Sequence, residues 1–275
     1  MINANHSQTS SSSSSSYQQT RAHCCFEEWM KLQEKDHSEL LQALTSSPDH
    51  DHVLDLDQNN KKEEQMRHLV EKGMNHFEKY VDKRSQLAQN DPPAYFGTTW
   101  CSTLELPLLW LSGCRPSIYV RLVYALCGIQ FHSQLSGFLE GGTLKTGDLG
   151  DLSATQLRKV DELQRVTIRA EEKLSEKLAS FQENIADAPI ADIASWKTLC
   201  LCESNRDVDD ALREHERNII GVYAEADKFR LSTLRELLNI LNPAQSVNFL
   251  AASKKLHLCI HNWGKQRDQS QGQEH

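Results

Sequence analysis

The stretch LSATQLRKVDELQRVTIRAEEKLSEKLASFQENI (152–185) is the part of the chain that decides its fold class. It opens with Ser153-Ala154-Thr155-Gln156, which has the form of a capping box, a side-chain arrangement that starts helices. Beyond it, small and apolar side chains recur at steps of three and four residues, the period of one helix face. They are Leu157, Val160, Leu163, Thr167, Ala170, Leu174, Leu178, Phe181 and Ile185. This length predicts a long bundle helix or a coiled-coil arm, which Pro189 ends or kinks.

The same period predicts five more helices, at about 25–44, 61–88, 103–111, 117–127 and 208–241. A last helix should start at Asn242-Pro243, because Asn is a favoured N-cap and Pro fits the first helical position. We expect it to end near Gly264. No stretch of any length has the pattern of a strand. The fold class is therefore all-α, a multi-helix bundle with long antiparallel helices.

Composition agrees with this class and excludes several others. The 275 residues are 39% hydrophobic and 25% charged, which is ordinary for a soluble globular protein. Only 12 Gly and 7 Pro are present, too few for the many tight turns of an all-β sandwich. Lys and Arg number 30 against 38 Asp and Glu, and this net charge of −8 does not favour binding to nucleic acid through phosphates alone.

The chain divides into one large helical domain and two short tails. Residues 1–22 include a serine run and should form a disordered tail, because they cannot bury enough apolar surface to order themselves. Residues 23–268 form the domain, and residues 269–275 a disordered C-terminal tail. Residues 47–60 are predicted to be a linker, and the glycine-rich residues 137–150 a flexible connection.

The sequence carries no signal for secretion or for a membrane. Its start has no apolar run with a cationic flank, and its most apolar stretch, residues 104–128, is interrupted by two prolines and two arginines. Eight cysteines occur without a C-x-x-C pair, so we expect free thiols in a reducing compartment. Phosphate-binding loops, nucleophile elbows and zinc-protease motifs are also missing, and we predict that the protein is not an enzyme.

His257 and His261 are the candidate cofactor ligands. Their spacing of four residues places both imidazoles on one helix face, where they could chelate a metal ion or one could be an axial ligand of haem. On a helical wheel the apolar centre consists of Phe249, Leu256, Ile260 and Trp263. The two histidines, flanked by Lys254 and Lys265, then lie at a boundary or exposed face, which also suits ordinary surface histidines.

Trp29 is the candidate partner residue. A Trp near a chain end is either a core anchor or a hot spot for a partner, since it supplies a large rigid contact area. A leucine zipper with DNA-binding function would need a dense basic run before its heptads. Residues 157–162 (LRKVDE) are not such a run, and we do not expect direct sequence-specific DNA binding.

Several long segments together resemble a known plant family. They are FEEWMKLQ (26–33), TTWCSTLELPLLWLSGCRPS (98–117), RLVYALCG (121–128), LSATQLRKVDELQ (152–164) and ILNPAQSVNFLAASKKLHLCIHNWGKQRD (240–268). The chain is similar through them to the DELAY OF GERMINATION family, whose domain also follows the zipper in TGA-type bZIP transcription factors. The resemblance spans about residues 20–268.

The resemblance implies a non-enzymatic regulator of seed dormancy, germination or seed maturation in abscisic-acid signalling. Such relatives bind and restrain clade-A type-2C protein phosphatases, so we expect a protein of the nucleus and cytoplasm. The implied phosphatase contacts are Phe26, Glu28 and Trp29, although the Asp-Ser start of the family's segment is replaced here by Cys24-Cys25. The segment around His257 and His261 is similar to the family's haem-binding segment, which implies haem at these residues.

Two alternative functions stay open at this point. The first is a transcription co-regulator that acts through the domain shared with the TGA factors and reaches DNA through a partner transcription factor. The second is a haem sensor in which the ligand changes the bundle. A self-dimer is a further possible partner arrangement.

Overall fold

The computed structural model describes residues 10–45, 56–90, 100–139, 149–194 and 206–271. The all-α prediction is confirmed. The helices are α1 (Ser10–Thr45), α2 (Leu56–Asn90), α4 (Ser117–Leu139), α5 (Ala154–Glu183), α6 (Arg206–Ile240) and α7 (Pro243–Gln271). Short 3-10 turns η1 (Leu106–Leu108), η2 (Leu149–Asp151), η3 (Asn184–Ala186) and η4 (Ile190–Ala194) connect them. Within these ranges the only β feature is an isolated bridge between Trp110 and Gly113.

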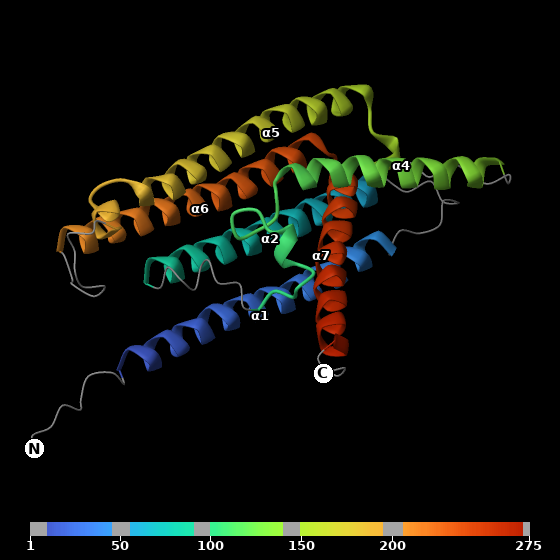
Figure 1. Cartoon of the computed structure of the whole chain (residues 1–275). Helices are drawn as coiled ribbons and strands as arrows, with labels where there is room; N and C mark the ends of the chain where they lie inside the picture. Colours follow the sequence, from blue (N-terminus) through green and yellow to red (C-terminus); the bar gives the residue numbers. More distant parts are fainter. Residues whose placement is uncertain (1–9, 46–55, 91–99, 140–148, 195–205, 272–275) are drawn as a thin grey trace, which may run out of the picture.

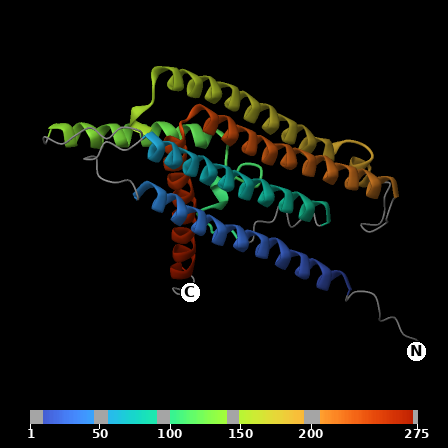
Figure 2. The ribbon, with the colours of Figure 1, turned by 180° about the vertical axis from the view of Figure 1, so that it is seen from behind.

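Four long helices lie alongside one another in the order α5, α6, α2, α1 (Figure 1). Helix α7 runs steeply across α1 and α2 and contacts both of them. Helix α4 packs against α5 and α7 near its start, and its C-terminal end extends past the neighbouring helices (Figure 2). The crossing helix α7 therefore ties the N-terminal pair of helices to the rest of the bundle.

The main core fills the space where these helices meet. Its fully buried side chains include Val120 of α4, Val160 of α5, Leu237 of α6 and Phe249 of α7. Removing such side chains from water is the dominant stabilising contribution to folding, at about 25 cal/mol for each Å² of apolar surface. Helices α1 and α2 also contribute buried residues to this core, Leu40 and Met74 among them.

The predicted helix starts are confirmed at α5 and α7. The Ser153 hydroxyl accepts a hydrogen bond from the Gln156 backbone N–H at 3.2 Å, and the Gln156 side chain accepts one from the Ser153 N–H at 3.0 Å. Asn242 caps α7, since its side-chain oxygen accepts from the Gln245 N–H at 2.8 Å. The capping box and the N-cap each involve residues close together in the chain, so both helix starts can be predicted without knowing the fold.

Several predicted boundaries were wrong. Helix α1 begins at Ser10 and not near Cys25, because the sequence up to Thr45 contains neither Pro nor Gly to interrupt it. The helix expected at 103–111 is only the turn η1, while α4 continues beyond its predicted end to Leu139.

At the other end of the chain, α7 passes through Gly264 and ends at Gln271. The two predicted tails are described only in part, since residues 1–9 and 272–275 lie outside the described ranges. Most of the predicted linker at 47–60 and most of the glycine-rich connection at 137–150 also lie outside them.

Within the described ranges, no helix combines the length and the apolar character that crossing a bilayer would require.

Candidate functional site

The crossing of α1 and α7 brings the two predicted sets of site residues into contact. The edge of the Phe26 ring on α1 faces the His261 ring on α7, with ring centroids 5.3 Å apart and planes at 67°. Phe26 also packs against Trp100, with centroids 5.9 Å apart. One candidate partner residue and one candidate cofactor ligand are therefore in contact, although they lie near opposite ends of the sequence.

Trp29 is a core anchor of this cluster. Its side chain is 7% exposed and stacks on Tyr80 of α2, with centroids 4.5 Å apart and planes at 7°. Lys254 of α7 lies over the indole ring, with its Nζ atom 5.6 Å from the centroid. Burial raises the pKa of Tyr80 to about 12. Trp29 thus fixes how α1 sits against α2 and α7.

Of the three predicted partner residues, only Glu28 lies on the surface. Its carboxylate is 2.5 Å from the Lys83 Nζ atom of α2, and this hydrogen bond raises the pKa of Lys83. Cys24 and Glu27 are also exposed beside it. We call Cys24, Glu27 and Glu28 the α1 ridge. Phe26 and Trp29 face inward behind it, so in this arrangement their side chains position the ridge.

His261 is buried and held by Glu105. It is 4% exposed, and its Nδ1 atom lies 3.0 Å from each carboxylate oxygen of Glu105. Glu105 in turn accepts hydrogen bonds from the Ser102 N–H at 2.8 Å and the Ser102 hydroxyl at 2.7 Å. Burial alone would raise the pKa of Glu105, but the hydrogen bonds from Ser102 and His261 hold it below its ordinary value.

Lys254 forms the second buried polar contact between α7 and α1. Its Nζ atom donates to Gln33 at 2.9 Å and to Asp36 at 3.0 Å. The other oxygen of Asp36 lies 2.9 Å from the Nδ1 atom of His76 on α2. Burial lowers the pKa of Lys254, although the negative charge of Asp36 opposes this shift. One buried carboxylate therefore joins three helices.

The helical-wheel prediction for α7 was wrong in its second half. Leu256 and Trp263, expected at the apolar centre, are 41% and 61% exposed, while His261 and Lys254 face inward. His257 is partly buried, and burial lowers its pKa. The first turns of α7 are buried on nearly all sides, which is why Phe249 does lie in the core. In the second half of α7, Asp36 pairs with Lys254 and Glu105 pairs with His261, and these contacts make burial of the two polar side chains favourable.

The histidine pair, as packed, does not fit a haem. A His whose Nδ1 atom contacts a carboxylate is typical of metal ligands, so the donor chemistry of His261 is suitable. The space around His261 does not suit a haem, because Phe26 and Glu105 enclose this side chain. Neither histidine lines any of four pockets found among the described residues. Among the described residues, no group of three or more His, Cys, Asp or Glu side chains could hold a metal ion.

A second buried cluster, which the sequence analysis missed, holds the loop before α4. Arg230 of α6 donates to the backbone oxygens of Cys114 at 2.7 Å and Leu111 at 3.0 Å, and pairs with Asp227 at 2.7 Å. Leu111 and Ser112 have positive φ angles of 47° and 57°. The guanidinium thus stabilises a backbone shape that such residues rarely adopt. The turn sequence at 112–117 was the only local signal in the sequence that pointed to this loop.

Arg115, beside that loop, makes a structural ion pair. Its Nε atom is 3.4 Å from Glu171, a buried residue of α5. The same carboxylate accepts hydrogen bonds from the Ser117 N–H at 2.6 Å and hydroxyl at 3.1 Å, at the start of α4. Glu171 therefore caps α4 from a neighbouring helix, where a negative charge is favourable.

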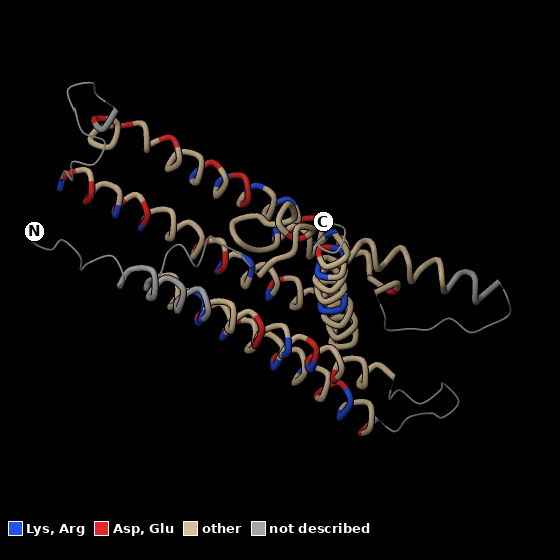
Figure 3. Tube along the Cα trace, turned by 60° about the horizontal axis from the view of Figure 1, so that its bottom comes forward, with Lys and Arg blue, Asp and Glu red and all other residues tan. Residues whose placement is uncertain are grey.

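The charges of the described helices do not form a continuous basic track. Figure 3 shows Lys and Arg interspersed with Asp and Glu along the long helices. A protein that binds nucleic acid through its phosphates concentrates positive charge on one face.

Comparison with known proteins shows relatives that match most of the chain. A family model described as "Seed dormancy control" (DOG1) matches residues 36–125. Protein DOG1-like 3 of Arabidopsis thaliana is 39% identical over 250 residues, which cover 89% of this chain and 84% of the relative. Protein DOG1-like 1 of the same plant is 38% identical over 262 residues, 89% of each chain. Transcription factor TGA7 is 24% identical over 84% of this chain and 52% of the factor.

Proposed function

Because the chain belongs to the DOG1-like family of plant proteins, we propose that it is a non-enzymatic regulator of seed dormancy or germination in abscisic-acid signalling. The observation that carries this proposal is the 39% identity to DOG1-like 3 over 84% of that protein. The matching family model is itself described as seed dormancy control. We place the activity in the nucleus and cytoplasm, where such a regulator would meet its signalling partners.

The proposed mechanism is binding and restraint of a clade-A type-2C protein phosphatase by the α1 ridge. Cys24, Glu27 and Glu28 are exposed, so they are available for contact. Phe26 and Trp29 act as positioning residues, because their packing sets the rotation of α1 and hence the direction of the ridge. Specific interfaces bury about 1,200–2,000 Å² in total, so the contact must extend beyond this ridge to its neighbours on α2.

Calorimetric titration of the purified chain with clade-A phosphatases tests this mechanism. Glu28→Arg reverses a charge on the ridge, and we expect it to weaken binding by about tenfold or more, the size of a hot-spot effect. Glu214→Arg is the matched control, because it reverses an exposed charge on α6. Full affinity in Glu28→Arg would place the interface elsewhere, and no binding by the wild type across the clade would contradict the phosphatase proposal.

Transcription co-regulation is the second candidate function. It is supported by the similarity to TGA7, which extends over 84% of this chain, and by the same kind of match to TGA2 at 23% identity. The chain would act through a partner transcription factor. A reporter assay with the chain tethered to DNA tests this function, since a co-regulator changes reporter output without a phosphatase being bound.

The proposed mechanism does not use haem at His257 and His261, because Phe26 and Glu105 enclose His261. Titration with haem, followed by the Soret band, measures haem binding by the wild type and by the His257→Ala/His261→Ala double variant. Saturable binding by the wild type that is lost in the double variant would bring the haem sensor back as a function.

A further inference from the structure

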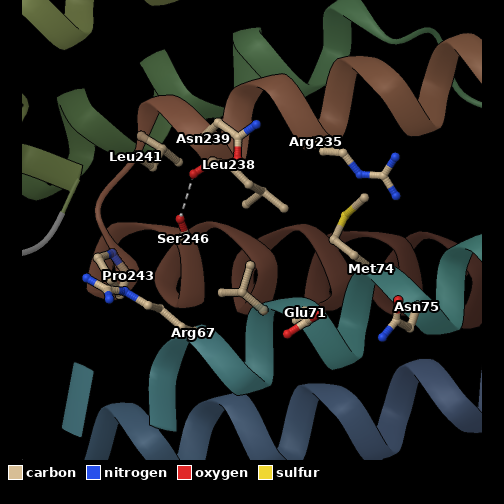
Figure 4. Close-up of a pocket in the computed structure, with 11 residues that line it drawn as sticks. Arg67, Glu71, Met74, Asn75, Arg235, Leu238, Asn239, Leu241, Pro243 and Ser246 are labelled. Atoms are coloured by element: carbon tan, nitrogen blue, oxygen red, sulfur yellow. Dashed lines mark hydrogen bonds between the residues drawn. The ribbon is translucent and has the colours of Figure 1, made fainter. Parts of the chain in front are cut away.

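A cavity of about 530 Å³ lies where α2, α6 and the start of α7 meet (Figure 4). Its lining shares no residue with the α1 ridge or with the cluster around His261. Ligand sites in proteins are typically cavities of about 300–1,000 Å³ with apolar walls and a few polar groups. The volume of this cavity is in that range.

The floor of the cavity is apolar. Three residues of the main core form it, and each is 7% exposed. They are Met74 of α2, Leu238 of α6 and Leu241 in the turn after α6. Only one edge of each side chain therefore faces the cavity. A bound apolar group would cover these edges and gain burial without disturbing the core.

Two arginines and one glutamate are the charged residues that line the cavity beside this floor. Arg67 of α2 and Arg235 of α6 lie toward opposite ends of the cavity in Figure 4, and Glu71 is the single acidic residue in the lining. Pro243, the first residue of α7, lies beside Arg67 in the lining, so the positive end of that helix dipole adds to the charge at this end.

Both arginines can accept a ligand anion at little cost. Among the described residues, Arg67 donates one hydrogen bond, to Glu63 at 3.2 Å, and Arg235 donates one, to Glu78 at 3.5 Å. A guanidinium carries five N–H donors, so each has donors left for a ligand. Exposed ion pairs of this kind contribute little free energy and exchange readily.

The dimensions limit the length of the ligand. Along α2 the lining runs from Arg67 to Asn75, which at 1.5 Å per residue is roughly 12 Å. We propose that this cavity binds a compact amphipathic organic anion, one or two rings carrying an acidic group, with the rings on Leu238 and Met74 and the acidic group on an arginine. A long extended chain would exceed the cavity. The proposal does not depend on the proposed function.

Methyl NMR of the full chain, labelled at its methionines, tests the proposal at the site itself. The chain has four methionines, and of the three in the described ranges, Met30, Met66 and Met74, only Met74 lines the cavity. The probe is anilinonaphthalene sulfonate, a two-part aromatic anion, and the neutral comparison is phenylnaphthylamine. We expect the sulfonate to shift the Met74 methyl signal saturably, and the neutral compound to bind at least about tenfold more weakly, as loss of a charge-assisted hydrogen bond implies.

Arginine variants separate this site from unspecific binding of an aromatic dye. Arg67→Gln and Arg235→Gln should together weaken sulfonate binding about tenfold or more. Arg213→Gln is the matched control, because it removes an exposed arginine of α6 that also has one acidic partner, Asp210 at 3.4 Å. Equal shifts with the neutral compound, unchanged affinity in the double variant, or shifts confined to the other methionines would overturn the proposal.

Discussion

Replacing Gly264 by alanine should destabilise the protein, because the added methyl group would overlap the loop that carries Glu105. A Cβ atom at this position would lie 1.9 Å from the Ser102 hydroxyl oxygen and 2.6 Å from the Ser102 Cβ atom. Ser102 is buried, and its hydroxyl donates to Glu105 at 2.7 Å, so it cannot rotate away without losing that hydrogen bond. The loop must therefore move off α7.

The expected loss of stability combines three effects. Overpacking of this kind costs about 1–3 kcal/mol, and a buried hydrogen bond left unmade costs about 1–3 kcal/mol. The better helix propensity of alanine returns about 1 kcal/mol. The net destabilisation should be about 1–5 kcal/mol, which for a chain of this size lowers Tm by roughly 2–20 °C.

Thermal and urea unfolding of Gly264→Ala measures this loss directly. Gly221→Ala is the matched control, since Gly221 is also inside a helix and a Cβ atom there would have no neighbour within 4 Å. The control should be more stable than the wild type by about 0.5–1 kcal/mol. If Gly264→Ala were as stable as the wild type, or gained stability like Gly221→Ala, the contact between the loop and α7 would be refuted.

Three further predictions concern the buried polar groups. Lys254→Met leaves Asp36 buried with one partner fewer and should cost about 3–5 kcal/mol in urea unfolding; a loss below about 1 kcal/mol would contradict the network. Because burial lowers the pKa of His257, the unfolded chain binds a proton more readily than the folded chain, so stability should fall as pH drops below about 6.5. His257→Gln should flatten that part of the stability profile, and an unchanged slope would refute this cause. Arg230→Lys keeps the charge but cannot bond the whole loop, so we expect a lower Tm and faster proteolysis of the 110–114 loop; wild-type values for both would mean that the guanidinium does not hold this loop.

The sequence predicted the parts of the fold that depend on neighbours in the chain. The capping box at Ser153, the N-cap at Asn242 and the stripe of α5 are all local patterns, and each is found in the structure, except that Ile185 lies beyond α5 and is 50% exposed. The end of α7 was misplaced because Gly264 was interpreted as a helix terminator. Its actual role is to let another segment approach closely, and that segment is distant in sequence.

The candidate site was predicted by residue but not by arrangement. The sequence singled out Phe26, Trp29 and His261, but the contact between Phe26 and His261 arises from the crossing of α1 and α7, which no local pattern encodes. The inward direction of His261 depends on Glu105, a carboxylate supplied by a distant loop. Hydrophobicity alone therefore assigned the wrong face of the second half of α7 to the core.

The activity of a clade-A type-2C phosphatase in the presence of this chain is the most direct test of the central claim. Hydrolysis of a phosphopeptide is followed while the purified chain is added to the phosphatase. We predict that activity falls as the chain approaches equimolar amount, equally for the wild type and Glu214→Arg, and that Glu28→Arg leaves the phosphatase active. Unchanged activity with the wild type, at concentrations that saturate any complex, would contradict the account.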